Sequence, residues 1–282
     1  MRIDHDRIFK ELLTTFFQEF IELFFPEFQG RIDWSSLKFL SNEAYSDKPQ
    51  KRQVDLLAQV RLIDQDQMFF LIHLEHQAQP QKDFEKRMFD YYCYLTISYQ
   101  LPVFPIALLS YAAPRRQEPH SHTIQILGKQ IVDFQYQVLQ LNQMPWRQFI
   151  NSTNPVAAAL MAKMKIEVAD RPLVKLQCLR LILSLQLDES KMRLIAGFVE
   201  TYLVLSAEEN LALRREIKKI QPQEANKMLK LTNFWIEEGK RKGLKLGEKR
   251  GEKRGEARGR TEAKVEVALN MHKQGFDLEV IA

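Results

Sequence analysis

Residues 52–77 read RQVDLLAQVRLIDQDQMFFLIHLEHQ, and this stretch decides the fold. Over residues 52–62 the even positions are apolar and the odd positions are mostly polar. Over residues 68–77 the even positions are apolar up to Leu74, while the odd positions change from apolar to polar along the segment. A period of two is typical of a strand with one buried face. The stretch therefore predicts two antiparallel strands joined by a short polar loop.

The register of this hairpin follows from the same alternation. Opposed residues of an antiparallel pair share a face, so their numbers must have an even sum if the apolar faces are to coincide. A three-residue loop at positions 64–66 gives a sum of 130, which places Leu56 opposite Leu74 and Asp55 opposite Glu75. Opposed Cβ atoms lie about 5 Å apart. We therefore expect the two carboxylates to lie side by side.

Two carboxylates at this separation repel each other unless a proton or a cation lies between them. Hard divalent cations such as Mg²⁺ prefer carboxylate oxygens as ligands. The pattern therefore favours a metal site built on Asp55 and Glu75. The alternation alone leaves a second interpretation open, in which the acids are solvated at a polar edge of the sheet.

The length of 282 residues allows one large domain or two modest ones. The first residues are too charged for a signal peptide, and no apolar run approaches the ~18 residues that indicate a membrane span. Cys93 and Cys178 are far apart in the sequence and indicate neither a disulfide framework nor a cysteine metal site. These features predict a cytoplasmic protein that does not enter a membrane.

The positive charge is confined to one segment near the C-terminus. Residues 237–264 hold 11 of the 41 Lys and Arg residues and 6 of the 36 Asp and Glu residues, so the rest of the chain has 30 of each sign. The basic composition therefore says little about the folded core and does not by itself indicate a nucleic-acid partner.

The remaining periodicities predict a mixed α/β domain, a helical part and a tail. The elements expected in residues 1–144 are a helix over 4–25, a strand over 37–45, a helix over 83–100, a buried strand over 103–109 and a hairpin over 123–141 with a turn at Gly128-Lys129. Because a helix precedes the buried strand, we expect that strand to pair in parallel after a crossover. Residues 145–238 have helical patterns throughout, with helices expected over 157–165, 172–187, 191–205 and 208–220.

Residues 239–282 form a charged tail in which glycine recurs at every fourth position from Gly239 to Gly259. An interior glycine costs a helix about 1 kcal/mol relative to alanine. We therefore expect a frayed, solvated helix or a flexible arm, and a dedicated DNA-binding arm is the alternative.

Several polar residues near the hairpin have more than one interpretation. Lys10 lies four residues after Asp6 on the expected helix, which is typical of a surface ion pair. Glu43 stands near the end of the first expected strand, either close to the acid pair or solvated. His73 and His76 are three apart on a strand and so face opposite sides, which argues against a joint metal chelate.

A helix, a three-stranded meander, a helix and a buried strand, with acids on the second and third strands, resemble the PD-(D/E)XK nucleases. More narrowly, the chain resembles the bacterial recombination-promoting nuclease (Rpn) family, also described as PD-(D/E)XK transposase-like proteins. The matching residues are His5-Asp6, Phe9-Lys10, Val54-Asp55-Leu56-Leu57, Ile72-His73-Leu74-Glu75-His76-Gln77, Arg87 with Tyr91, and the glycine-every-four tail. The resemblance covers most of the chain and implies a restriction-endonuclease-like core, a mixed sheet flanked by helices, followed by the helical subdomain and the tail.

This resemblance implies metal-dependent hydrolysis of DNA phosphodiester bonds, linked to recombination or mobile DNA. It implies catalytic roles for Asp55, Glu75 and Gln77, and Mg²⁺ or Mn²⁺ held by Asp55, Glu75 and the carbonyl oxygen of His76. The auxiliary residues would be Lys10, Glu43, Arg87 and Tyr91. The expected partners are DNA and a second copy of the chain in a homodimer.

Gln77 is a departure from the superfamily, which usually has Lys at this position. Lys offers a cation or, once deprotonated, a base, whereas Gln forms only neutral hydrogen bonds. Gln belongs to the Rpn-like pattern, so its presence does not predict an inactive protein. The alternative function is a catalytically inactive nuclease-fold protein that serves as a DNA- or protein-interaction module.

Overall fold

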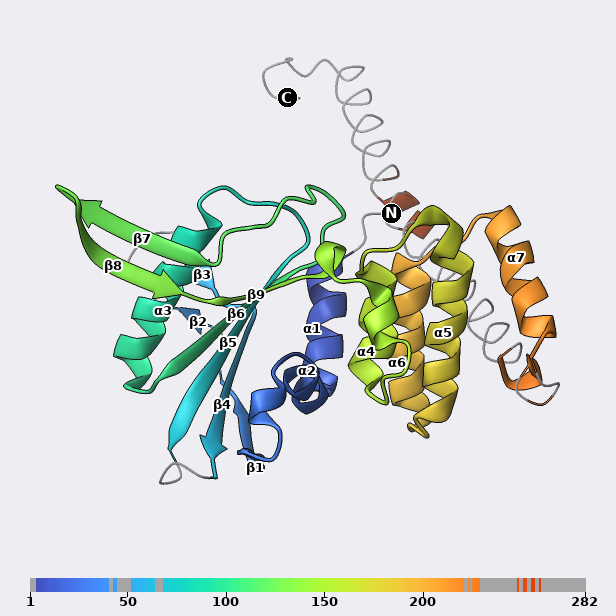
Figure 1. The fold of residues 1–282 in the computed structure, drawn as a ribbon, viewed down its shortest axis with the longest axis horizontal. Coiled ribbons are helices and arrows are strands. Elements are labelled where there is room, and N and C mark those ends of the chain that lie inside the picture. The colour runs from blue at the N-terminus through green and yellow to red at the C-terminus, as the bar shows by residue number, and fades with distance from the viewer. Residues whose placement is uncertain are drawn as a thin grey trace, which may run out of the picture. The chain divides into compact units, whose positions relative to one another are not determined.

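The structure is a computed structural model, which describes residues 4–40, 54–63 and 68–220, the backbone of 43–44 and 52–53, and positions 223, 225–228, 248, 251–252, 255–256 and 259. The chain divides into two compact units, residues 1–228 and 229–282. The first unit contains a mixed sheet, helices on both of its faces and a group of further helices (Figure 1). The boundaries expected at residues 144 and 238 stay predictions.

The sheet has five strands in the order β1-β4-β5-β6-β9. They are β1 Ile32–Phe39, β4 Leu56–Leu62, β5 Phe69–Gln77, β6 Val103–Leu109 and β9 Gln137–Gln140. The first three pair antiparallel, whereas β6 is parallel to β5 and β9 is parallel to β6. The expected mixed sheet is therefore confirmed, including the parallel pairing after the crossover helix.

The register of the central hairpin is the one derived from the sequence. Leu56 faces Leu74 and Ala58 faces Ile72, both with a sum of 130. The strand expected over residues 52–62 is wrong in one respect, because it is divided into β3 Arg52–Gln53 and β4. The division has a physical cause: the amide of Asp55 donates to the Glu75 side chain instead of to a main-chain carbonyl.

Helices cover both faces of the sheet. On one side lie α1 His5–Thr15 and α2 Phe17–Phe24, where a single helix over residues 4–25 was expected. The chain leaves helical geometry at Phe16, with φ −124° and ψ 42°, and this break separates two helices that bury Phe9, Phe17 and Phe20. Aromatic and β-branched residues around the break have modest helix propensity, so interrupting the helix there costs little free energy.

The opposite face is covered by α3 Phe84–Tyr99, as expected. Leu57 and Leu71, at odd positions, pack against Leu95 and Tyr91 of this helix. The odd positions of β5 are therefore apolar where α3 covers them and polar where the strand reaches the site described below.

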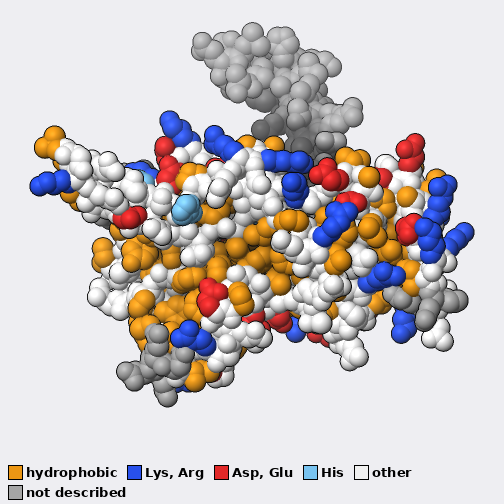
Figure 2. Space-filling view, in the orientation of Figure 1, with side chains coloured by type: hydrophobic (Ala, Val, Ile, Leu, Met, Phe, Trp, Pro, Cys, Tyr) orange, Lys and Arg blue, Asp and Glu red, His pale blue; other side chains and the backbone are white. Residues whose placement is uncertain are grey.

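Two strand predictions in the flanking regions need correction. The strand expected over 37–45 begins earlier, as β1, and is followed by β2 Glu43–Ala44, which pairs with β3. The hairpin expected over 123–141 is β7 Ser121–Ile126 and β8 Lys129–Gln135, with its turn at Leu127-Gly128, and β9 leaves it to join the main sheet. The turn residues have positive φ, 48° and 76°, which suits glycine at the second position. The tip of this hairpin exposes apolar side chains (Figure 2).

The helices after residue 145 belong to the same unit as the sheet. They are α4 Pro155–Leu160, α5 Arg171–Ser184, α6 Glu189–Tyr202 and α7 Ala207–Lys218. Short 3-10 turns complete the unit: η1 Pro26–Phe28, η2 Leu141–Gln143, η3 Trp146–Phe149, η4 Met161–Lys163 and η5 Val168–Asp170. The group packs against the N-terminal helices, for example through the rings of Phe9 and Phe198, whose centroids lie 4.9 Å apart.

In the second unit, Gly251, Gly255 and Gly259 have helical backbone and are exposed, and the three earlier glycines of the repeat lie outside the described residues. None of the helices in the described part of the chain combines the length and apolarity that a membrane span requires.

Candidate active site

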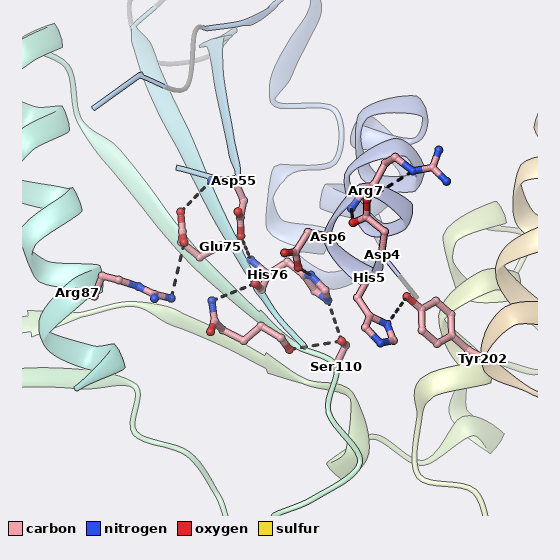
Figure 3. Close-up of polar contacts among 11 residues, drawn as sticks. Asp4, His5, Asp6, Arg7, Asp55, Glu75, His76, Arg87, Ser110 and Tyr202 are labelled. Atoms are coloured by element: carbon pink, nitrogen blue, oxygen red, sulfur yellow. Dashed lines mark hydrogen bonds and ion pairs between the residues drawn. The ribbon is translucent and has the colours of Figure 1, made fainter. Parts of the chain in front are cut away.

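The two predicted carboxylates meet where β4 begins and β5 ends. The main-chain N–H of Asp55 donates to Glu75 Oε1 at 3.0 Å, and the N–H of His76 donates to Asp55 Oδ2 at 2.8 Å. Each acid is thus fixed by a main-chain donor of the opposite strand, which extends the hairpin register by one side-chain-mediated pair (Figure 3). The expected pairing of Asp55 with Glu75 is present.

The electrostatics of this pair oppose ionisation of Asp55. Burial is the largest cause and the charge of Glu75 the second, and together they raise the pKa of Asp55 from 3.8 to about 7. The His76 N–H and the Arg87 guanidinium act in the opposite direction but do not compensate. Glu75 is itself buried, with 3% of its surface exposed. The site therefore has an excess of negative charge.

His73 fixes the orientation of Glu75 from within the sheet. It is fully buried, and its Nε2 lies 3.0 Å from Glu75 Oε1. Because Glu75 accepts hydrogen bonds as a carboxylate, this nitrogen is the donor. The ring meets Tyr91 of α3 edge-to-face, with centroids 5.4 Å apart. His73 therefore limits the freedom of the Glu75 carboxylate.

His76 points to the other face of the sheet, as its position on the strand predicts. Its ring stacks on Phe9 of α1 with centroids 3.8 Å apart, and its Nε2 lies 2.8 Å from the Ser110 hydroxyl. Burial above all, then the charges of Lys163 and His5, lowers the pKa of His76 to about 3. Its imidazole is neutral and packed. The two histidines therefore do not converge on one metal ion.

Gln77 is buried at the end of β5 and faces main-chain atoms. Its Nε2 donates to the carbonyl oxygen of His76 at 3.0 Å. Its own carbonyl accepts the Ser110 N–H at 2.9 Å, which links the ends of β5 and β6. Gln77 is therefore a neutral donor beside the carbonyl oxygen that the family resemblance implies as a metal ligand.

A cleft of about 560 Å³ is lined by Asp55, Glu75, His76 and Gln77. Arg87 and Tyr91, one helical turn apart on α3, both reach it. The Arg87 guanidinium lies 4.0 Å from Glu75 Oε2, donates to the Gln81 side chain and lies over the Phe84 ring at 5.0 Å. This cation is held in place from three sides, close to the acid pair.

The N-terminus of α1 forms the opposite wall, which the residue patterns alone did not assign to the site. Asp4, His5 and Asp6 line the cleft, and Asp6 Oδ1 lies 3.6 Å from His76 Nδ1. The Asp6 charge also contributes to the raised pKa of Asp55. The spacing of Asp6 from Lys10 is typical of a surface ion pair. Only the family resemblance, whose matching residues include His5-Asp6, gave a reason to connect this segment with the site.

The helical part also reaches this wall. His5 Nδ1 lies 3.0 Å from the hydroxyl of Tyr202 on α6, and Lys163 Nζ lies 4.9 Å from the centroid of the Tyr202 ring. Burial lowers the pKa of Lys163. These residues lie more than 150 positions from His5, and no sequence pattern connects them.

The two remaining predicted residues lie at the edge of the site. Lys10 lines a second hollow of about 310 Å³ that also contains Asp55 and His76. Glu43 pairs through its backbone with Gln53, two residues before Asp55, and its side chain lies outside the described part of the structure.

The donor set suits a hard cation. In the part of the chain that the structure describes, no three His, Cys, Asp or Glu side chains form a complete metal-binding group. Mg²⁺ is commonly held by one or two carboxylates, with water and substrate oxygens completing its shell. A carboxylate whose pKa is raised by burial and by a second acid is a site that a divalent cation would relieve. Asp55 and Glu75 fit such an ion, with the His76 carbonyl beside them.

One comparison with known proteins gives a match to this part of the chain. The family model described as "Putative transposase, YhgA-like" matches residues 3–102, which include α1, the acid hairpin and α3. The resemblance inferred from the sequence is thereby confirmed over these residues. No curated protein and no solved structure matches the chain.

Proposed function

We propose that this chain is a metal-dependent DNA endonuclease of the PD-(D/E)XK type, associated with recombination or mobile DNA. The observation that carries the proposal is the pair Asp55 and Glu75 in the lining of a cleft, where the Glu75 carboxylate accepts the Asp55 N–H and the Asp55 carboxylate accepts the His76 N–H. The family match supports DNA as the substrate, because that family is described as a transposase. The mixed sheet with helices on both faces is consistent with a nuclease-like core.

In this proposal Asp55, Glu75 and the His76 carbonyl hold Mg²⁺ or Mn²⁺. Such an ion, when bound, polarises a phosphoryl oxygen and lowers the pKa of a water molecule. The protein supplies the rest. His73 and two main-chain N–H groups keep the carboxylates in place, so little reorganisation is needed when substrate enters.

Arg87 and Gln77 have different tasks. Arg87 is a permanent cation at 4.0 Å from Glu75 and within reach of a phosphate bound in the cleft. Gln77 has no proton to exchange and orients a water molecule or a phosphate oxygen through neutral hydrogen bonds. Proton removal from the attacking water therefore falls to another group or to solvent.

Plasmid nicking tests the proposal. Supercoiled DNA is incubated with the full chain in Mg²⁺, in Mn²⁺ and in chelator, beside Asp55→Asn and Glu75→Gln. The matched control is Asp133→Asn, an exposed acid of β8 far along the chain from the cleft. We expect nicking only with metal, its loss in both cleft variants and its retention in the control.

Nicking that survives both cleft substitutions would place the chemistry elsewhere. Absence of nicking in the wild-type chain with either metal would favour the inactive nuclease-fold protein as the function.

A further inference from the structure

The His76 side chain is held between two elements that come from distant parts of the chain. Its ring stacks on Phe9 of α1, with centroids 3.8 Å apart and an interplanar angle of 17°. Its Nε2 lies 2.8 Å from the hydroxyl of Ser110, the residue that follows β6. His76 and Ser110 are both buried, with 5% and 1% of their surface exposed. The histidine therefore links the end of β5 to the N-terminal helix and to β6.

Asp6, His76 and Ser110 lie in the order of a Ser-His-Asp triad (Figure 3). Two observations exclude a nucleophilic serine. Ser110 is buried, and in the described part of the chain it lines neither of the two hollows that His76 lines. Asp6 Oδ1 lies 3.6 Å from His76 Nδ1, beyond the distance of about 2.6–3.2 Å at which an acid orients such a histidine. The arrangement therefore has another role.

A single hydroxyl proton decides how the Ser110 side chain is used. Its Oγ lies 2.8 Å from His76 Nε2 and 3.4 Å from the Gln77 carbonyl oxygen. The Asp6 carboxylate near Nδ1 only accepts, so it favours the imidazole proton on Nδ1 and leaves Nε2 as the acceptor. The hydroxyl therefore donates to Nε2, over the shorter distance. The Gln77 carbonyl accepts the main-chain N–H of Ser110 instead, at 2.9 Å.

Ser110 thus contacts both of the last two residues of β5, and these residues reach the acid site. The N–H of His76 is directed to Asp55 on the β4 side of the strand, whereas the carbonyl of Gln77 is directed to the β6 side. Because neighbouring residues of a strand pair on opposite sides, fixing residue 77 on β6 directs the main-chain groups of residue 76 toward β4. The His76 carbonyl oxygen, which also accepts Gln77 Nε2 at 3.0 Å, is thereby held near the acid pair.

The end of β5 lacks a strand partner on one side. The β4 ladder ends at Leu56 with Leu74, whereas β6 pairs with β5 as far as Gln77. Main chain outside a ladder opens more easily than main chain within it. We propose that the Ser110 hydroxyl and the His76 imidazole are positioning groups, which hold the end of β5 so that the His76 carbonyl oxygen and the two carboxylates are preformed for a divalent ion. The assignment rests on the proposed function, which supplies the ion.

Manganese binding to the full chain, without DNA, tests this role. The electron paramagnetic resonance signal of free Mn²⁺ gives the dissociation constant for the wild type, Ser110→Ala and His76→Phe. The first variant removes only the hydroxyl, and the second keeps a ring that can stack on Phe9 but removes both nitrogens. The matched control is Ser184→Ala, which removes a hydroxyl that donates to the Leu181 carbonyl at 2.9 Å on α5.

We expect the Mn²⁺ dissociation constant to rise about tenfold in Ser110→Ala and about 10- to 100-fold in His76→Phe, because both lose a group that orients a metal ligand. The Ser184→Ala control should bind Mn²⁺ as the wild type does. DNA affinity in chelator, measured by fluorescence anisotropy, should be the same for all four proteins, because none of the substitutions removes a charge.

A purely structural contact would give a different result. Ser110→Ala would then lower the melting temperature and leave the Mn²⁺ dissociation constant at the wild-type value, which would overturn the proposal even if His76→Phe did not fold. Labelling of Ser110 by a fluorophosphonate would also overturn it, because the serine would then be an accessible nucleophile. A wild-type chain that binds Mn²⁺ but does not nick DNA would contradict the hydrolase, while weaker Mn²⁺ binding by Ser110→Ala would still support the positioning role.

Discussion

Replacement of Asp55 by Asn should make the metal-free protein more stable at neutral pH while it removes activity. A pKa raised from 3.8 to about 7 corresponds to roughly 4 kcal/mol at about 1.4 kcal/mol per pKa unit. The side chain is partly exposed, and water that reaches it reduces the expected effect to about 2–4 kcal/mol. Asn removes the charge but keeps an oxygen that can accept the His76 N–H.

The sign follows from proton linkage. The folded-state pKa lies above the unfolded one, so the folded protein binds more protons between pH 3.8 and about 7. Stability attributable to Asp55 is therefore fully present below pH 3.8 and is lost as the pH rises through about 7. The advantage of Asp55→Asn should be small near pH 4, grow with pH and level off above about pH 7.

Urea denaturation in chelator across this pH range measures the effect, with Asp133→Asn as the exposed control, for which a change within about 0.5 kcal/mol is expected. At about pH 8, Asp55→Asn should raise the free energy of unfolding by about 2–4 kcal/mol, or the melting temperature by about 5–15 °C. A variant that is destabilised equally at low and high pH would refute the view that the Asp55 charge is strained by its surroundings.

Three further outcomes are expected. His73→Leu removes the donor that orients Glu75, so single-turnover nicking should slow about 10- to 100-fold with little change in DNA affinity, and an unchanged rate would exclude this role. Tyr202→Phe loses the hydroxyl contact with His5 but keeps the ring, so urea denaturation should give a loss of about 1 kcal/mol, whereas no loss would mean that this contact does not tie α1 to α6. Deletion of residues 239–282 removes all of the excess positive charge, so DNA binding should weaken and its salt dependence should flatten; an unchanged slope would remove the tail from DNA binding.

The sequence predicts the central hairpin well because two independent constraints agree there. A side-chain period of two requires an even sum, since a slip by one residue would expose every apolar side chain of one strand, and a three-residue loop selects the sum of 130 that the structure has. The helix over residues 83–100 and the buried strand over 103–109 are also predicted by short-range patterns, namely helical spacing followed by a short apolar run. The acid pair was therefore predictable from the residues themselves.

The break at Asp55 was not predictable from alternation. Periodicity reports which face a side chain occupies, not which acceptor a main-chain N–H uses. Here the acceptor is the Glu75 carboxylate, so β4 begins only at Leu56, and residues 54 and 55 separate it from β3. The break at Phe16 was not predictable from periodicity either, because aromatic residues continue at helical spacing on both sides of it.

The second wall of the site depends on contacts that sequence patterns do not encode. His5 and Asp6 reach the cleft only because α1 packs on the sheet beside the end of β5. Tyr202 and Lys163 reach His5 because the later helices pack within the same unit. Helical periodicity identifies the buried faces of these elements but not their partners.

The most direct test of the account is a Mg²⁺ titration by isothermal calorimetry at about pH 6 and about pH 8, in buffers of different ionisation enthalpy. Because Asp55 is largely protonated at pH 6 in the free protein, Mg²⁺ should bind with release of about one proton there and with almost none at pH 8. Asp55→Asn should abolish this release and weaken binding strongly. Binding without proton release at pH 6, or binding that Asp55→Asn leaves unchanged, would contradict a metal site on the Asp55 and Glu75 pair.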